Sequence, residues 1–179
     1  MDELELQILI RSSLITLLTA QGYGDWEVTS SYQSTPQGRE STPTLYFFEL
    51  PENLYGWQGR KDVYNRATGE MLRKESQMYR SGFQVQGLYE LPPEATSGPT
   101  AATITRVASM LINSQGFRKL LRAHGVFMER VTDIRKLYMR NDRDHFEQVP
   151  SFDFTCTHER SIIQQSTAAS RVESRFMRV

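Results

Sequence analysis

The segment MLRKESQMYRSGFQVQGLYE, residues 71–90, predicts one long β-strand. Its second half has the period of two that is typical of strands, because Phe83 and Val85 alternate with Gln84 and Gln86. This segment is several times longer than the usual strand of about 5–6 residues. Long strands outside a barrel either curl or reach beyond their domain, so this element suits a protein that belongs to a larger assembly.

Further strands are predicted on both sides of this segment. Residues 149–159 alternate clearly, with four side chains on one face: Phe152, Phe154, Cys156 and His158. TLYFFEL, residues 44–50, predicts a short strand that is buried on both faces. Residues 126–139 predict one or two strands, whereas the glycine-containing residues 51–70 are expected to be irregular.

Helical periodicity is confined to two regions. Residues 3–21 predict a helix that ends before Gly22. Thr100 and Ser114 are candidate N-caps of two further helices, and Gly125 is a candidate C-terminal glycine for the second. Because the helices are grouped apart from a mostly antiparallel sheet, the fold class is α+β, with an N-terminal helix and a central helix pair flanking the sheet.

Length and composition indicate one soluble domain. The chain has 179 residues, and its 21 basic and 21 acidic residues give a net charge of zero, which argues against a polybasic nucleic-acid binder. Cys156 is the only cysteine, so an intramolecular disulfide or a multi-cysteine zinc site is excluded. The acidic start, MDELELQ, lacks the basic region of a signal peptide, and we expect a protein made in the cytoplasm with no membrane segment.

The charges are unevenly distributed along the chain. Residues 1–50 carry a net charge of −5, so the remainder carries +5. Such a molecule can attract a copy of itself or stack between unlike partners, although a compact fold can also average the two regions out. Polar segments near residues 29–43, 91–99 and 164–179 are expected to be extended arms of the single domain, 1–179, which become ordered on a neighbour.

No catalytic motif is present in the sequence. It lacks the glycine-rich phosphate loops, the nucleophile elbow and the H-E-x-x-H metal motif. Cys156 and His158 share a strand face, but an inward thiol and a partly buried imidazole explain the pair better than a metal site does. Asp142, Asp144 and His145 form the densest polar cluster, in a segment whose composition predicts a solvated turn. We therefore expect no enzyme, no metal and no cofactor.

Interface residues are predicted in three regions that combine charge with exposure. Arginine, methionine and aromatic side chains are enriched in protein interfaces. The candidates are Arg66, Arg73, Lys74 and Arg80 around the long strand, Asp142 and Arg143 at the turn, and Arg175, Phe176, Met177 and Arg178 at the C-terminus.

With TPTLYFFELPE at 42–52 and VTDIRKLYMRNDRDHFEQVPSFDFTCTHERSI at 131–162, the chain resembles, from about residue 42 to 163, the neck or tail terminator (gateway) proteins of tailed bacteriophages. The resemblance begins at TPTLYFFELPE, 42–52, and continues through FQVQGLY, 83–89, and LLRAHGV, 120–126. It is most specific at VTDIRKLYMRNDRDHFEQVPSFDFTCTHERSI, residues 131–162, where two strands and a turn follow at the family's spacing. The acidic first helix and the extended C-terminus depart from that pattern.

The resemblance implies a structural virion protein at the top of the tail, assembled in the host cytoplasm. Such terminators form a ring, usually of six copies, that caps the tail tube and offers a docking surface to the head–tail connector or collar. In contractile tails they also meet the sheath, and the genomic DNA passes through the ring without sequence-specific binding. A closed ring requires a head-to-tail interface, which a chain of this size can supply.

Three other functions stay open at the level of sequence. The first is a head–tail adaptor or tail-completion protein of the same neck, which would bind the portal rather than the tube. The second is a metal-dependent nuclease that uses Asp142, Asp144 and His145. The third is a monomeric binding module, which would stay monomeric at all concentrations.

Overall fold

The computed structural model describes residues 1–30, 42–89, 98–140 and 146–167. It has three helices and seven strands in the described ranges. The helices are α1 (Glu3–Ala20), α2 (Ala101–Ile112) and α3 (Gln115–Arg122). The strands are β1 (Glu27–Ser30), β2 (Thr44–Glu49), β3 (Asn53–Asn65), β4 (Glu70–Leu88), β5 (Phe127–Val131), β6 (Arg135–Arg140) and β7 (Phe146–Thr167).

The strands form one sheet around the long pair β4 and β7. These two pair antiparallel without interruption from Glu70–Thr167 to Gln86–Ser151. On the other side of β4, β2 pairs near one end and β3 near the other, and β1 adds to β2 in parallel. On the other side of β7 lie β5 and β6. The α+β class with a mostly antiparallel sheet is confirmed.

The helices begin and end where local chemistry favours it. Asp2 and Glu5 form a reciprocal capping box at the start of α1: the Glu5 N–H donates to Asp2 Oδ1 at 2.7 Å and the Asp2 N–H to Glu5 Oε2 at 2.8 Å. Gly22 then adopts a φ of +83°, which L side chains rarely adopt. Ser114 caps α3, as predicted, by accepting a hydrogen bond from the Phe117 N–H.

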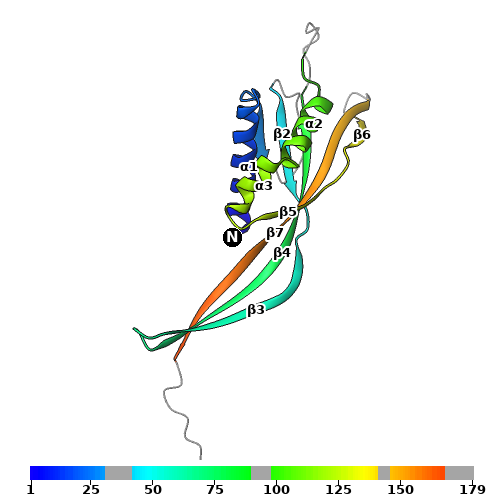
Figure 1. Ribbon diagram of the computed structural model, residues 1–179. Helices are drawn as coiled ribbons and strands as arrows, with labels where there is room; N and C mark the ends of the chain where they lie inside the picture. The colour runs from blue at the N-terminus through cyan, green and yellow to red at the C-terminus, as the bar shows by residue number, and fades with distance from the viewer. Residues whose placement is uncertain (31–41, 90–97, 141–145, 168–179) are drawn as a thin grey trace, which may run out of the picture.

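The core lies between the helices and one face of the sheet (Figure 1). Phe152, Phe154 and Cys156 of β7 are completely buried, which confirms the alternation predicted for residues 149–159. Phe154 stacks on Phe83 of β4 at 5.2 Å between ring centroids. β2 differs from the prediction, because Phe47 is buried but its neighbours on the other face are only half-buried.

Residues 53–65 form a strand, which corrects the expectation that 51–70 are irregular. β3 is exposed along nearly its whole length, so neither face carries the apolar periodicity that reveals a strand with one buried face. Its pairing with β4 shifts register between Tyr55 and Gly59, and Gly56 has a φ of +74°. The glycines therefore mark a bulge within a strand rather than a loop.

Candidate functional site

A three-stranded arm extends from the helix-covered part of the molecule. We define the arm as β3, residues 70–79 of β4 and residues 158–167 of β7, and the body as the rest. Figure 1 shows the arm leaving the body as one curved ribbon, without a helix on either face. Two of its strands, β4 and β7, continue without interruption from the core, so the arm begins directly at the edge of the body.

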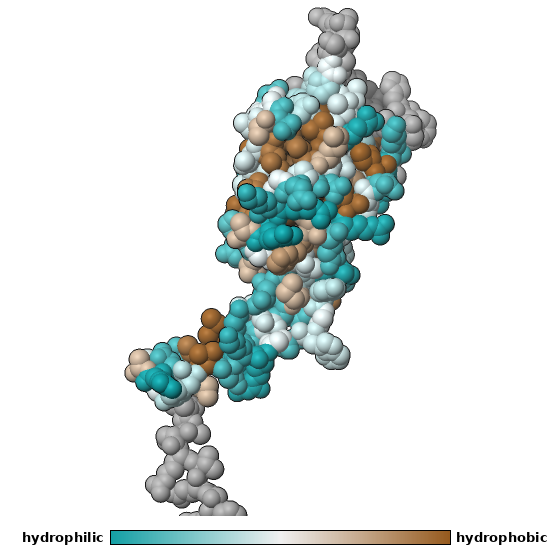
Figure 2. All heavy atoms as spheres, in the orientation of Figure 1, coloured by the Kyte–Doolittle hydropathy of each residue, from teal (hydrophilic) through white to brown (hydrophobic). Residues whose placement is uncertain are grey.

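Large apolar side chains are exposed on the arm. Trp57 is 97% exposed, more than any other large apolar residue in the described ranges. Figure 2 shows hydrophobic side chains on the surface of this part of the molecule. Exposed apolar groups that gather in this way mark interaction surfaces on soluble proteins. The exposed set on the arm is Leu54, Tyr55, Trp57, Val63, Tyr64, Ile162 and Ile163.

Ion pairs tie the arm strands to one another. Arg73 Nε of β4 lies 3.0 Å from Asp62 Oδ1 of β3, and this hydrogen bond holds the pKa of the Asp62 carboxyl below its usual range. Lys74 Nζ lies 2.8 Å from Glu159 Oε1 of β7, which lowers the pKa of Glu159 for the same reason. These exposed pairs contribute little stability individually. They do hold the paired charged side chains in defined positions on the two faces of the arm.

The predicted basic residues of the long strand lie in or next to the arm. Arg73 points to one face and Lys74 to the other, because successive residues of a strand alternate. Arg80, at the junction with the body, lies 2.8 Å from Glu129 of β5 and over the ring of Tyr55. Arg66 is exposed in the turn between β3 and β4. Three of the four are thus engaged within the chain.

The remaining predicted interface residues lie outside the described residues. They are Asp142, Arg143, Arg175, Phe176, Met177 and Arg178. The alternative cluster of Asp142, Asp144 and His145 also falls there.

A buried polar cluster lies where the arm joins the body. His158 is 1% exposed, and its Nε2 lies 3.0 Å from Ser81 Oγ and 3.1 Å from Glu52 Oε1. The Ser81 hydroxyl donates to the same Glu52 oxygen at 2.6 Å. Burial lowers the pKa of His158, and the neighbouring Glu52 carboxylate opposes that shift only in part. A neutral imidazole with its proton on Nε2 fits these contacts.

This cluster does not have the geometry of a hydrolytic triad. In a triad, the imidazole nitrogen that faces the serine differs from the one that faces the carboxylate. Here Ser81 and Glu52 both meet Nε2, while Nδ1 is buried without a hydrogen-bond partner in the described residues. Ser81 is also completely buried. The three residues link the segment between β2 and β3 to β4 and β7. Their arrangement therefore serves the structure rather than catalysis.

Cys156 is likewise inward and unavailable for chemistry. Burial raises the pKa of its thiol to about 12, so the reactive thiolate is suppressed at neutral pH. This placement bears out the inward positions predicted for Cys156 and for His158, although His158 is more fully buried than expected.

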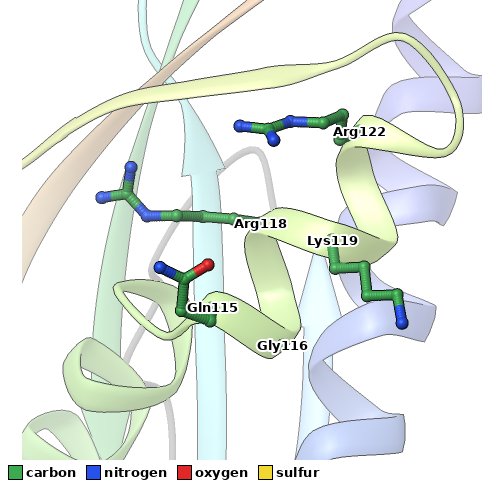
Figure 3. Close-up of a pocket in the computed structure, with 5 residues that line it drawn as sticks. All are labelled: Gln115, Gly116, Arg118, Lys119 and Arg122. Carbon is green, nitrogen blue, oxygen red and sulfur yellow. The ribbon is translucent and has the colours of Figure 1, made fainter.

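A cation-lined hollow of about 320 Å³ lies on α3. Figure 3 shows Arg118 and Arg122 pointing away from α1 and Lys119 pointing toward it. Gln115 and Gly116 complete the lining, which includes no carboxylate, histidine or nucleophile. An acid–base pair therefore cannot be assembled here.

The described ranges contain neither a candidate metal site nor a candidate membrane-spanning helix. No group of three or more His, Cys, Asp and Glu side chains is close enough there to hold a metal ion. Among the same residues, no helix has both the length and the apolar character needed to cross a bilayer.

Sequence reasoning missed the apolar surface of the arm. The basic residues of β4 were found, but the exposed residues of β3 were not, because residues 51–70 were not recognised as a strand. The available signal was composition: Leu54, Tyr55 and Trp57 stand within four residues in a segment otherwise rich in glycine and charge. On β7, the pair Ile162 and Ile163 gave the same signal.

Comparisons with known proteins identify one family and one related fold. A family model described as "E217 gateway protein gp29" matches residues 5–168, which include both the body and the arm. No curated protein matches the sequence. A solved structure with a similar fold is the PVC sheath/tube terminator of an extracellular contractile injection system, in its extended state. It has a TM-score of 0.53 and 10% identity, and the match covers 96% of this chain but only 62% of that terminator.

Proposed function

Because the chain belongs to the E217 gateway protein gp29 family, we propose that it is a non-catalytic virion protein that terminates the tail of a bacteriophage. In this proposal, copies of the chain form a ring, usually six, on the last ring of the tail tube. The ring stops tube growth, leaves a channel for the genome and joins the tail to the head connector or collar. Virion assembly in the host cytoplasm follows from this role.

The family match over residues 5–168 is the observation that carries the proposal. The match reaches from α1 to the end of β7, so it includes the uncovered arm as well as the core. The similar fold of a sheath/tube terminator supports the same role and adds tube and sheath proteins to the candidate partners.

The surface chemistry of the arm supports a role in assembly. Exposed aromatic and aliphatic residues, with arginine beside them, resemble the composition of protein interfaces. A three-stranded sheet that leaves both faces open gains stability when a neighbour covers it. The zero net charge of the whole chain suits a channel through which DNA slides, because a strongly basic lumen would retain DNA through counterion release.

The test is the mass of the purified protein over a concentration series, with and without isolated tail tubes. We expect rings in solution, or monomers that assemble only on tube ends, and electron microscopy should show capped tubes of unchanged length. Isolated portal rings serve as the second target. Binding to portals but not to tubes would replace the terminator with a head–tail adaptor. A monomer that ignores both would contradict the proposal.

A further inference from the structure

The outer edge of β7 is open along the arm. On this side β5 pairs with β7 up to Thr157 and β6 pairs nearer its start, but no strand among the described residues pairs beyond that point. The Met1 amine donates to the Glu159 carbonyl oxygen at 3.3 Å, so the open part of the edge begins at residue 160. Residues 160–167 extend about 25 Å at roughly 3.3 Å per residue, and they present a row of backbone N–H and C=O groups outward.

The part of this edge nearest the tip of the arm, residues 161–167, has none of the features that normally protect an open edge. Natural proteins blunt exposed edges with lysines, prolines, bulges or inward charges, because an open flat edge pairs with other chains. SIIQQST, residues 161–167, contains no charge, no proline and no glycine. Its Ile162 and Ile163 are 62% and 67% exposed. An edge of this composition is suited to pairing with another strand.

The same arm has a second, different open edge on β3. β3 pairs with β4 on one side, and no other described strand contacts its opposite side. Both β3 and β7 are antiparallel to β4, so they run in the same direction, toward the tip of the arm. One copy therefore has two different open edges, β3 and β7, on opposite sides of its arm, and the two strands run in the same direction.

We propose that the β7 edge of one copy, residues 160–167, pairs in parallel with the β3 edge of the next copy, so that the arms join into one continuous sheet. This inference rests on the ring of the proposed function. Rotation about a ring axis brings equivalent arms side by side without reversing them, which places β7 beside a parallel β3. A contact between two different edges is heterologous, and its repetition forms a closed ring when the rotation from one copy to the next divides a full turn evenly. Backbone bonds supply the affinity, as in strand addition generally.

The side chains at the two edges are compatible with this pairing. Register across β4 places Val63 and Ile163 on one face of the arm, and Tyr64 and Ile162 on the other. The same register sets Ile163 level with Lys61 and Val63 level with Gln165, so a shift of two residues between neighbouring copies would bring Ile163 beside Val63. Pairs of β-branched and aromatic residues on adjacent strands are favourable.

Engineered disulfides test the pairing in assembled protein. Ser161→Cys is combined with Lys61→Cys in one variant and with Val63→Cys in another, since all three positions share a face and lie at the outer strands. The native Cys156 is buried and does not interfere. Mild oxidation should produce a covalent ladder up to the full ring in at least one variant. Ser161→Cys with Met110→Cys, on α2 of the body, is the matched control and should give no ladder.

The outcomes separate this inference from the function on which it rests. Intact rings without a ladder in either variant would overturn the edge pairing and leave the ring standing. Cross-links to the tube or sheath protein instead of a second copy would overturn it in favour of another occupant. The absence of rings both in solution and on tube ends would contradict the proposed function first, and the inference with it.

A second pair of variants does not depend on disulfide geometry. Ile163→Lys places a charge on the open edge, and Met110→Lys changes a residue of matching exposure, 69%, on the body. Met110→Lys should keep the wild-type unfolding midpoint, whereas Ile163→Lys, directly opposite Lys74, should lower it slightly, so assembly is compared under conditions where both variants are fully folded. We expect Ile163→Lys to raise the concentration needed for assembly by about tenfold or more, and Met110→Lys to leave it unchanged. Equal assembly by both variants would overturn the proposal.

Discussion

The backbone N–H of Gly87 in β4 donates to Thr105 Oγ1 in α2 at 3.1 Å, so the helix rests directly on the strand. A Cβ at position 87 would lie 2.6 Å from that hydroxyl oxygen and 2.9 Å from the carbonyl oxygen of Ala101. Thr105 is itself completely buried. The close approach holds α2 against the end of the long strand that lies farthest from the arm.

Gly87→Ala should therefore destabilise the protein. The added methyl group meets backbone and a buried hydroxyl that cannot move away cheaply, and overpacking of this kind costs about 1–3 kcal/mol. Urea unfolding, followed by far-UV circular dichroism, measures the change. Gly24→Ala is the matched control, because its Cβ would meet Thr19 only at an ordinary 3.5 Å. Equal unfolding midpoints for the two variants would contradict this account of the helix–strand contact.

Phe154→Ala should cost about 3–5 kcal/mol of unfolding free energy. Phe154 is completely buried, with Phe83 stacked on it and Phe117 meeting it edge-on. Its removal leaves a cavity at the centre of the core. Ile163→Ala, in the arm and mostly exposed, should change the unfolding free energy of the monomer by less than about 0.5 kcal/mol. Denaturant titration of both variants at one protein concentration makes the comparison.

The stability of the protein should fall on acidification because of His158. Burial lowers the pKa of this imidazole in the folded state, so below about pH 6.5 the unfolded chain binds more protons than the folded one. The unfolding free energy is then fully present above that pH and decreases as the pH falls toward the folded pKa. Urea midpoints at pH 7.5, 6.5 and 5.5 measure the slope. His158→Gln should flatten it, whereas His124→Gln, on the exposed residue after α3, should leave it unchanged.

Cys156 should be unreactive toward thiol reagents in the native protein. Its thiol is completely buried, and the pKa is raised to about 12. At pH 8 we expect full labelling in denaturant and almost none without it, so the native labelling rate reports opening of the core. Rapid labelling of the folded protein would contradict the position of β7 in the core.

The core of the fold was predictable from sequence because one side of the sheet is buried. Phe152 and Phe154 alternate with polar residues, and that period of two fixes both the strand and its buried face. Thr100 and Ser114 marked the starts of α2 and α3, since their hydroxyls accept backbone N–H bonds. These features depend on neighbouring residues, and local sequence therefore encodes them.

The arm and the junction cluster were not predictable in the same way. β3 has two exposed faces, so burial imposes no pattern on residues 53–65. Glu52 and His158 are 106 residues apart in the chain, and they meet at Ser81 because β3 and β7 pair with opposite sides of β4. The charges of Arg73 and Lys74 were visible in the sequence, whereas the pairing of Arg73 with Asp62 follows from the β3–β4 register and that of Lys74 with Glu159 from the β4–β7 register.

The continuity of β4 and β7 from core to arm has a mechanical consequence. Load applied along the arm acts parallel to the strands, and the ladder between Glu70–Thr167 and Gln86–Ser151 then resists it in shear, with its bonds strained together. Load applied sideways at the tip would instead peel the same ladder open one bond at a time. The molecule is therefore stiff under tension along the arm and compliant under bending, so its resistance to force depends on direction.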